Sequence, residues 1–347
     1  MKVVAISQDN YPQFYSLTQT LVQGPMLLPM VWQDCLWGVL AYSDDNKLLA
    51  GWVGRKRLSG WKARLYQEIV FDSMPQVFSD ENRTTYDSAN SPLFDALIQA
   101  AITKGKREHI AALIITHWSR TKFEWHDKNF IPEENATFIN NLQQDNLIMT
   151  LDSSLRNKIR KAEKSGVQFI VYSKDEAIQM LPRFQSLRAE TQARAVERNE
   201  GSSMLLKSES YYKNILENYD STLVAARTAD GEIASMTLCI KSGKTMYTYY
   251  SGSDIEQNRK TGCSAYLKWK IFELAARQGC TQVDMSGVPV NPTPDHPAYG
   301  VYRFKASYSG DYQQFRGGVF LLLPIRYRLV GSLKTNRHLL RLLSKRM

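Results

Sequence analysis

Residues 259–265 combine two basic side chains, a glycine and small polar residues directly before an apolar helix pattern. Backbone amides at the N-terminus of a helix bind anions, and neighbouring cations strengthen such a site. We therefore expect Arg259, Gly262 and Ser264 to form a loop that binds an anionic part of a donor substrate. The sequence predicts no metal site, because the four cysteines are scattered and no histidine lies at zinc-finger spacing.

A second cationic element lies upstream, where Arg156, Arg160 and Lys164 recur every four residues along one face of a helix pattern. Leu155, Ile159 and Ala162 form the apolar stripe of the same helix. The basic face is either simply solvated or contacts an RNA or lipid-linked phosphate.

Three predicted strands lead to the 259–265 segment. Residues 223–228, 232–240 and 245–250 are separated by Asp230-Gly231 and Ser242-Gly243, which are strong hairpin signals. A helix with regular apolar positions follows Gly262, and a strand at 282–285 comes next. This order resembles that of GNAT-like acyltransferases. The loop resembles the family's coenzyme A pyrophosphate loop only in part, because Ser264 stands where a second glycine or alanine belongs.

Several separated segments resemble, in the same order, those of the Fem family of nonribosomal peptidyltransferases. They are the basic helix at 155–167, Thr191 with Arg194, Tyr211 with Tyr212, residues 249–252, 283–287 and 302–305, and Gly317. The resemblance covers about half of the chain, from Leu151 to Gly318. It implies that an amino acid moves from aminoacyl-tRNA to a peptidoglycan precursor, as in the building of cell-wall cross-bridges.

The resemblance also implies roles for individual residues. Lys305 is the first catalytic candidate, since a fixed cation stabilises the negative charge that develops on a carbonyl oxygen under attack by an amine. Phe304 is expected to pack or stack beside it. The alternative for Lys305 is a solvated lysine next to a core phenylalanine.

Five further residues of the matched segments are candidates for substrate binding: Arg194, Arg303, Tyr212, Tyr250 and Asp284. A guanidinium binds a phosphate or carboxylate in a bidentate manner, which suits the two arginines. Asp284 has a simpler alternative, in which a strand-end aspartate caps the turn at Ser286-Gly287. Two histidines outside these segments, His117 and His126, bracket an aromatic and basic run that we interpret as a substrate-side loop or ordinary packing.

The length of 347 residues predicts two domains. We expect an α/β (α+β) chain with two GNAT-like acyltransferase domains, each a mixed central sheet flanked by helices. The first domain is expected to be discontinuous, with residues 1–148 plus 318–347 recognising the acceptor, and residues 149–317 carrying the transfer chemistry. In the first half we expect a helix to Leu21, strands at 36–42, 47–53, 61–70, 111–116 and 146–151, and a helix from Pro92.

The formal charge of +10 is concentrated at the C-terminus, where residues 312–347 carry eight basic side chains and no acidic one. Together with the leucines at 321–343, this favours either an interfacial helix on an anionic membrane or a strand followed by a packed helix. No run of 18 apolar residues and no signal-peptide pattern is present. We therefore expect a cytoplasmic protein, with peripheral contact with the inner face of the cell membrane as an added option.

The leading hypothesis is thus an aminoacyltransferase with aminoacyl-tRNA as donor, a peptidoglycan precursor as acceptor, soluble or lipid-linked, and no cofactor. The alternative is a GNAT N-acyltransferase that uses acetyl-CoA or another acyl-CoA and acts on an amino sugar or small amine. A third hypothesis is a noncatalytic protein of the same fold that binds RNA or a membrane surface.

Overall fold

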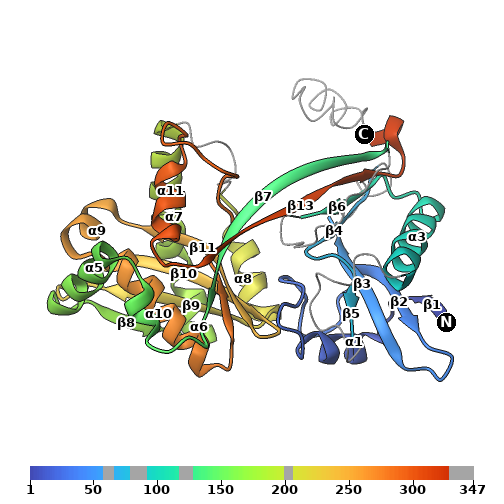
Figure 1. The fold of residues 1–347 in the computed structure, drawn as a ribbon, viewed down its shortest axis with the longest axis horizontal. Helices are drawn as coiled ribbons and strands as arrows, with labels where there is room; N and C mark the ends of the chain where they lie inside the picture. The colour runs from blue at the N-terminus through green and yellow to red at the C-terminus, as the bar shows by residue number, and fades with distance from the viewer. Residues whose placement is uncertain (58–65, 79–91, 117–127, 199–205, 328–347) are drawn as a thin grey trace. The chain divides into compact units, whose positions relative to one another are not determined.

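A computed structural model describes residues 1–57, 66–78, 92–116, 128–198 and 206–327 of the chain. The chain folds into two compact units, each assembled from separate stretches of sequence (Figure 1). The first unit comprises Met1–Leu17, Trp32–Glu134 and Phe315–Met347, and the second comprises Thr18–Val31 and Asn135–Gln314. The expected α/β class with mixed sheets flanked by helices is confirmed, and so is the discontinuous first domain.

The first unit is built on strands in the order β1-β2-β3-β4-β6-β13, with β5 beside β3. Alternate residues of β2 face opposite sides, so that Trp37, Val39 and Ala41 join the core under helix α3, whereas Leu40 lies on the side of Phe14 from α1. The elements are β1 (Lys2–Ala5), α1 (Tyr11–Thr18), β2 (Leu36–Tyr42), β3 (Leu48–Lys56), β4 (Glu68–Phe71), β5 (Gln76–Val77), α3 (Pro92–Arg107), β6 (Ala112–Ile115) and β13 (Asp311–Leu321).

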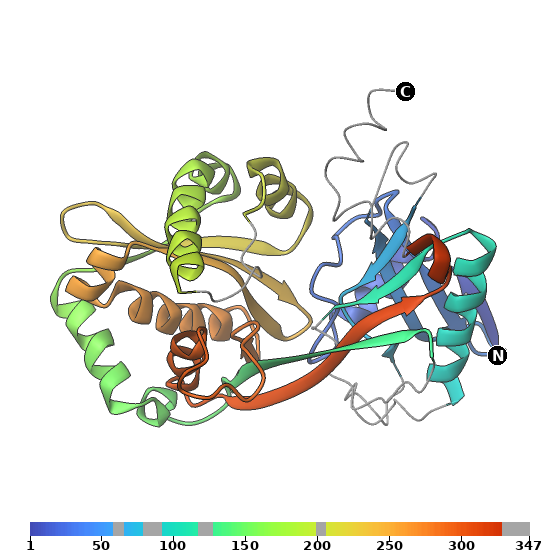
Figure 2. The same cartoon turned by 90° about the horizontal axis from the view of Figure 1, so that it is seen from above.

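The second unit has strands in the order β7-β12-β11-β10-β9-β8, in which only the β11–β12 pair is parallel. Figure 2 shows helices α7 and α8 over one face of strands β9 to β11, and α10 with α5 over the other. The strands are β7 (Phe130–Asn141), β8 (Gln168–Val171), β9 (Ser221–Arg227), β10 (Ile233–Ser242), β11 (Thr245–Ser253) and β12 (Gln282–Asp284). The helices are α4 (Leu147–Thr150), α5 (Ser153–Lys164), α6 (Lys174–Gln179), α7 (Leu181–Glu197), α8 (Glu209–Asn218), α9 (Ile255–Thr261), α10 (Cys263–Arg277) and α11 (Tyr299–Ala306).

The core of the second unit follows the predicted apolar patterns. Leu155, Ile159 and Ala162 of α5 are buried against α10, whose own buried positions face β9 to β12. Both hairpin turns of the meander are present, with Gly231 and Gly243 at positive φ, a conformation that glycine adopts without a steric penalty. The predicted strand–turn–strand order therefore builds the sheet that carries the site.

One local prediction was wrong. Residues 146–151 form a helical turn, α4, in place of a strand, because Asn146 adopts a left-handed conformation and the apolar side chains pack onto the core without a neighbouring strand to pair with. Strand β7 ends shortly before this turn, at Asn141. Helices α6 and α7 are separate elements that meet at Met180, next to Pro182, which lacks the amide that a continuous helix would use.

Several sequence predictions lie outside the described residues. They concern the run from His117 to His126, part of the strand at 61–70 and the C-terminal basic helix beyond residue 327. Among the described helices, none has the length and apolar character needed to cross a lipid bilayer.

Gly252 provides a test of how closely α7 must approach β11. A Cβ atom at this position would lie 2.6 Å from the carbonyl carbon of Leu187 and 2.7 Å from the amide nitrogen of Arg188. We expect Gly252→Ala to lower the free energy of unfolding in urea by about 1–3 kcal/mol, because rigid backbone must move. Gly300→Ala in α11 is the matched control, since nothing lies near its added methyl group. Equal stability of the two variants would contradict this packing.

Candidate active site

Strands β11 and β12 separate early, and the candidate site lies where they diverge. They pair only between Thr245–Tyr247 and Gln282–Asp284. Beyond this point the chain turns away through Ser286, which has a positive φ of 67°, and the Ser286 hydroxyl donates a 2.5 Å hydrogen bond to the carbonyl of Thr248. The part of β11 that follows Tyr247 therefore has no strand partner on the β12 side among the described residues, and its side chains can face a ligand.

Asp284 fixes the turn at which β12 ends. Its side chain is fully buried, and Oδ1 accepts hydrogen bonds from the Ser286 amide at 2.8 Å and the Thr137 hydroxyl at 2.6 Å. These contacts match the turn-capping interpretation of Asp284. The substrate-binding role predicted for Asp284 stays a prediction.

Lys305 lies on α11 with its amine against that turn. Nζ donates hydrogen bonds to the carbonyl oxygens of Ser286 and Gly287, at 3.1 and 2.9 Å. The pKa of Lys305 falls to about 7, because burial disfavours the charged amine and the charge of Lys268 repels it, while Asp284 acts in the opposite direction. Lys305 is thus a positioned amine whose charge can change near neutral pH.

The C-terminal end of α11 is anchored by Tyr308, which holds Phe304 and Lys305 in place. Tyr308 is fully buried, its hydroxyl donates to the carbonyl of Ala265 at 3.0 Å, and its carbonyl accepts from the Asn140 side chain at 2.7 Å. The ring of Phe304 packs edge-on against Tyr308, with centroids 5.5 Å apart. The Phe304-Lys305 pair therefore rests on the core and not on a free loop.

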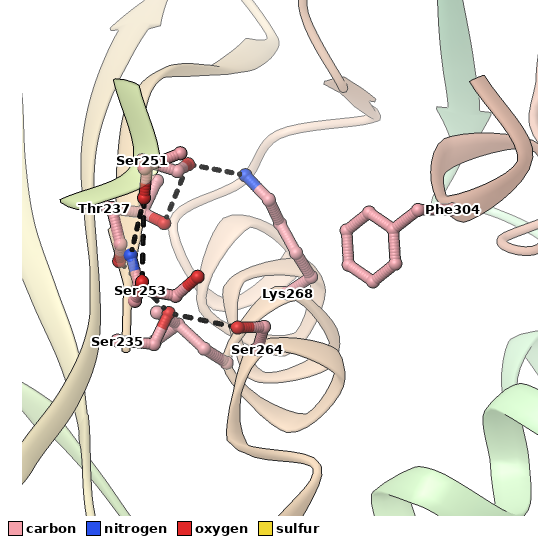
Figure 3. A pocket seen from close by; sticks show the side chains of 10 residues that line it. Ser235, Thr237, Ser251, Ser253, Ser264, Lys268 and Phe304 are labelled. Carbon is pink, nitrogen blue, oxygen red and sulfur yellow. Dashed lines mark hydrogen bonds between the residues drawn. The ribbon is translucent and has the colours of Figure 1, made fainter. Parts of the chain in front are cut away.

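A cavity of about 110 Å³ lies between the free part of β11, helix α10 and Phe304 (Figure 3). Its wall is rich in hydroxyl groups. It is lined by Thr191, Ser235, Thr237, Ser251, Gly252, Ser253, Ser264, Leu267, Lys268 and Phe304. Of the residues predicted from sequence, the structure brings Phe304 and Ser264 together at this cavity.

Lys268 is the residue of this cavity that sequence reasoning missed. Figure 3 shows its side chain reaching from α10 to Ser251, where Nζ donates to the hydroxyl at 3.1 Å. Burial lowers the pKa of Lys268 to about 8. A signal was present in the sequence, because Ser264, Leu267, Lys268 and Ile271 share one face of the α10 helix and the apolar members of that face are buried.

A buried cluster of tyrosines lies on the other face of β11. Tyr212 is fully buried and packs edge-on against Tyr250 and Phe184, and among the described residues its hydroxyl has no hydrogen-bond partner. The guanidinium of Arg188 lies 4.7 Å from the centre of the Tyr250 ring and donates to the carbonyl of Ser251 at 3.2 Å. The structure therefore places Tyr212 and Tyr250 behind the strand that lines the cavity.

The two arginines predicted to bind substrate have different surroundings. The guanidinium of Arg194 donates to the carbonyl of Ser253 at 2.7 Å and to the hydroxyl of Thr191 at 3.1 Å, which ties α7 to the end of β11. Burial lowers the pKa of Arg194. Arg303 is exposed on α11. Their predicted contacts with phosphates or carboxylates stay predictions.

The predicted anion-binding loop is not an open loop. Arg259 is exposed in the last turn of α9, Gly262 alone joins α9 to α10, and α10 begins at Cys263. The amides of Cys263 and Ser264 donate to the side chains of Thr261 and Asn258, at 3.3 and 3.0 Å. These amides are therefore already satisfied within the chain.

Helix α5 covers the same turn. A Cβ atom at Gly262 would lie 2.7 Å from the carbonyl oxygen of Lys158, and Lys161 donates to the carbonyl of Arg259 at 3.2 Å. Among the described residues, no group of three or more histidine, cysteine, aspartate or glutamate side chains could hold a metal ion.

Comparison with known proteins was made on sequence and on structure. The sequence model of the acetyltransferase (GNAT) domain matches residues 151–306, and no curated protein matches the chain. The structure of FemX superposes with a TM-score of 0.69 at 15% identity and covers 95% of this chain and all of FemX. The chain has a Fem-type, GNAT-like fold. The predicted acyltransferase class agrees with the match of the acetyltransferase (GNAT) domain model to residues 151–306.

Two other solved structures share this Fem-type fold at lower similarity. The C-terminal domain assigned to a lysylphosphatidylglycerol synthetase of Agrobacterium fabrum has a TM-score of 0.51 at 12% identity, covering 85% of this chain and 88% of that one. A conserved protein of unknown function from Bacteroides thetaiotaomicron has a TM-score of 0.51 at 12% identity, covering 92% and 99%. The fold of this chain thus recurs in proteins with very different sequences.

The amine of Lys305 can be tested by its reactivity with acetic anhydride as a function of pH. Only a neutral amine reacts, so labelling of Lys305 should rise with a midpoint near pH 7. Lys268→Met removes a like charge and should move the Lys305 midpoint upward. Peptide mass spectrometry reads the labelling of Lys305 in both proteins. A Lys305 midpoint near the ordinary lysine value of about 10.4, or one that stays fixed in Lys268→Met, would contradict the described environment.

Proposed function

We propose that this chain is an aminoacyltransferase that moves an amino acid from aminoacyl-tRNA to an amine of a peptidoglycan precursor. The observation that carries this proposal is the state of the α10 N-terminus. A coenzyme A pyrophosphate needs free amides there, but those of Cys263 and Ser264 bond to Thr261 and Asn258, and α5 packs over Gly262. The half-buried Phe304-Lys305 pair, which we propose as the transfer centre, is nevertheless held in place by Tyr308 and by the turn after β12.

The surface of α5 supports a polyanionic donor. Lys158, Arg160, Lys161 and Lys164 are exposed on this helix, and Glu163 is the one exposed acid among them. Such a stripe attracts the phosphate backbone of a nucleic acid in a salt-dependent way. The similarity in fold to FemX, with a TM-score above that of the other structures named, adds to this interpretation.

The reaction joins an amine to a carbonyl carbon. The acceptor nitrogen attacks the ester carbonyl of the aminoacyl group, the new carbon–nitrogen bond forms, and the bond to the ribose oxygen breaks. The proton lost by the nitrogen ends on that ribose oxygen, so the products are an amide and a tRNA with a free hydroxyl. Lys305 in its charged form stabilises the oxyanion of the tetrahedral intermediate, and Phe304 packs beside the reacting group.

The cellular setting follows from these substrates. Charged tRNA and peptidoglycan precursors meet in the cytoplasm, and a lipid-linked acceptor would bring the protein to the inner face of the membrane. The basic C-terminal segment 312–347 has the charge for contact with an anionic leaflet. We propose no cofactor. The acceptor is recognised by the first unit.

The donor and the role of Lys305 are tested together with purified protein. Aminoacyl-tRNA and acetyl-CoA are offered in parallel with muropeptide precursors in nucleotide-linked and lipid-linked forms, and amide products are quantified by mass spectrometry. We expect product from aminoacyl-tRNA, and a loss of about 100-fold or more in kcat for Lys305→Ala, because a fixed charge at the oxyanion is removed. Lys213→Ala, an exposed lysine on α8, is the control.

Each outcome of that experiment separates two hypotheses. Transfer from acetyl-CoA to an amino sugar or small amine, with none from tRNA, would replace the proposal by a GNAT N-acyltransferase. Saturable tRNA binding without turnover, equal in the parent protein and in a folded Lys305→Ala variant, would indicate the noncatalytic binding protein.

A further inference from the structure

Lys268 is a buried cation that forms no ion pair with a carboxylate among the described residues. Its side chain is 6% exposed, and the structure gives its amine one hydrogen bond, to the hydroxyl of Ser251. An ammonium group has three donors, and burying one costs free energy unless it is paired. Lys270, on the same helix, shows the usual solution, since it forms an ion pair with Glu273 at 3.0 Å. Lys268 lines the cavity, and its amine can donate further hydrogen bonds to a ligand there.

A second buried cation lies close to Lys268. Arg188 is 4% exposed, donates to the carbonyl of the same Ser251, and its Nε has no partner among the described residues. The other polar side chains of the cavity wall are hydroxyls, which can accept or donate. Ser251 therefore contacts two buried cations.

The size of the cavity limits what it can hold. The cavity of about 110 Å³ has room for several water molecules, since about 10–15 Å³ of such volume holds one, and it is therefore large enough for a small acyl side chain. Phe304 forms part of the wall, and Lys305 follows it on α11. The Lys305 amine is close enough to Lys268 for the charge of Lys268 to act on it. An acyl group whose carbonyl lies beside Lys305 is therefore within reach of this cavity.

We propose that this cavity receives the side chain of the transferred acyl group and that Lys268 restricts the donor to small neutral or acidic aminoacyl groups. The inference rests on the proposed function. A hydroxyl or carboxylate on the acyl group accepts from the Lys268 amine and satisfies it. A basic side chain such as that of lysine meets a like charge in a buried site, which discriminates strongly against it.

The test compares donors that differ only in the acyl group. Alanyl, seryl, glutamyl and lysyl groups are loaded onto one and the same tRNA, and kcat/KM is measured for each. We expect the parent protein to use lysyl-tRNA at least about tenfold less well than seryl-tRNA. In Lys268→Met the ratio of lysyl to alanyl transfer should rise by about tenfold, and glutamyl transfer should fall. Lys270→Met, outside the cavity, should keep the parent order.

A parent selectivity order that persists in an active Lys268→Met variant would overturn the proposal. If Lys268→Met does not fold, Lys268→Gln removes the charge and keeps a donor for Ser251, and the same ratios are measured. If no aminoacyl-tRNA is a donor, the proposed function fails separately. The cavity is then tested with succinyl-CoA against β-alanyl-CoA, for which a charge preference that is insensitive to Lys268→Met contradicts the inference.

Discussion

The early separation of β11 from β12 is the constraint on which the rest of the second unit depends. Because the two strands pair over only three residues, the end of β11 is left with one strand neighbour, β10, and its hydroxyl side chains face a cavity instead of a sheet. Asp284 and Ser286 hold the split open by capping the turn that leads β12 away. That turn also supplies the two carbonyl oxygens that position the Lys305 amine.

Two amines give this opening its chemical character, the buried Lys268 on α10 and the half-buried Lys305 on α11. The pKa of Lys305 is lowered by its desolvation and by the charge of Lys268, whereas the carboxylate of Asp284 acts in the opposite direction. Such a site is prepared for a group that brings or develops negative charge, as the carbonyl oxygen does during acyl transfer. At the N-terminus of α10, the amides of Cys263 and Ser264 are bonded to side chains of α9, whereas a coenzyme A pyrophosphate needs free amides there.

Sequence reasoning reached the parts of this site that depend on local pattern. The hairpin glycines Gly231 and Gly243 predicted the meander, and the order of short motifs predicted the acyltransferase class. Sequence reasoning could not show that Asn258 and Thr261 accept hydrogen bonds from the amides after Gly262, because these contacts exist only when residues 255–261 form helix α9. Lys268 was missed although its spacing places it on the same helix face as Leu267 and Ile271, because a lysine within an apolar helix normally points to solvent.

A crystal structure with a stable amide analogue of aminoacyl-adenosine tests the central claim most directly. The account predicts that the carbonyl group of the analogue lies beside Lys305, with its acyl side chain in the cavity next to Lys268 and Phe304. An empty cavity in those crystals, together with acetyl-CoA bound at the N-terminus of α10 and the side chains of Asn258 and Thr261 displaced, would contradict it.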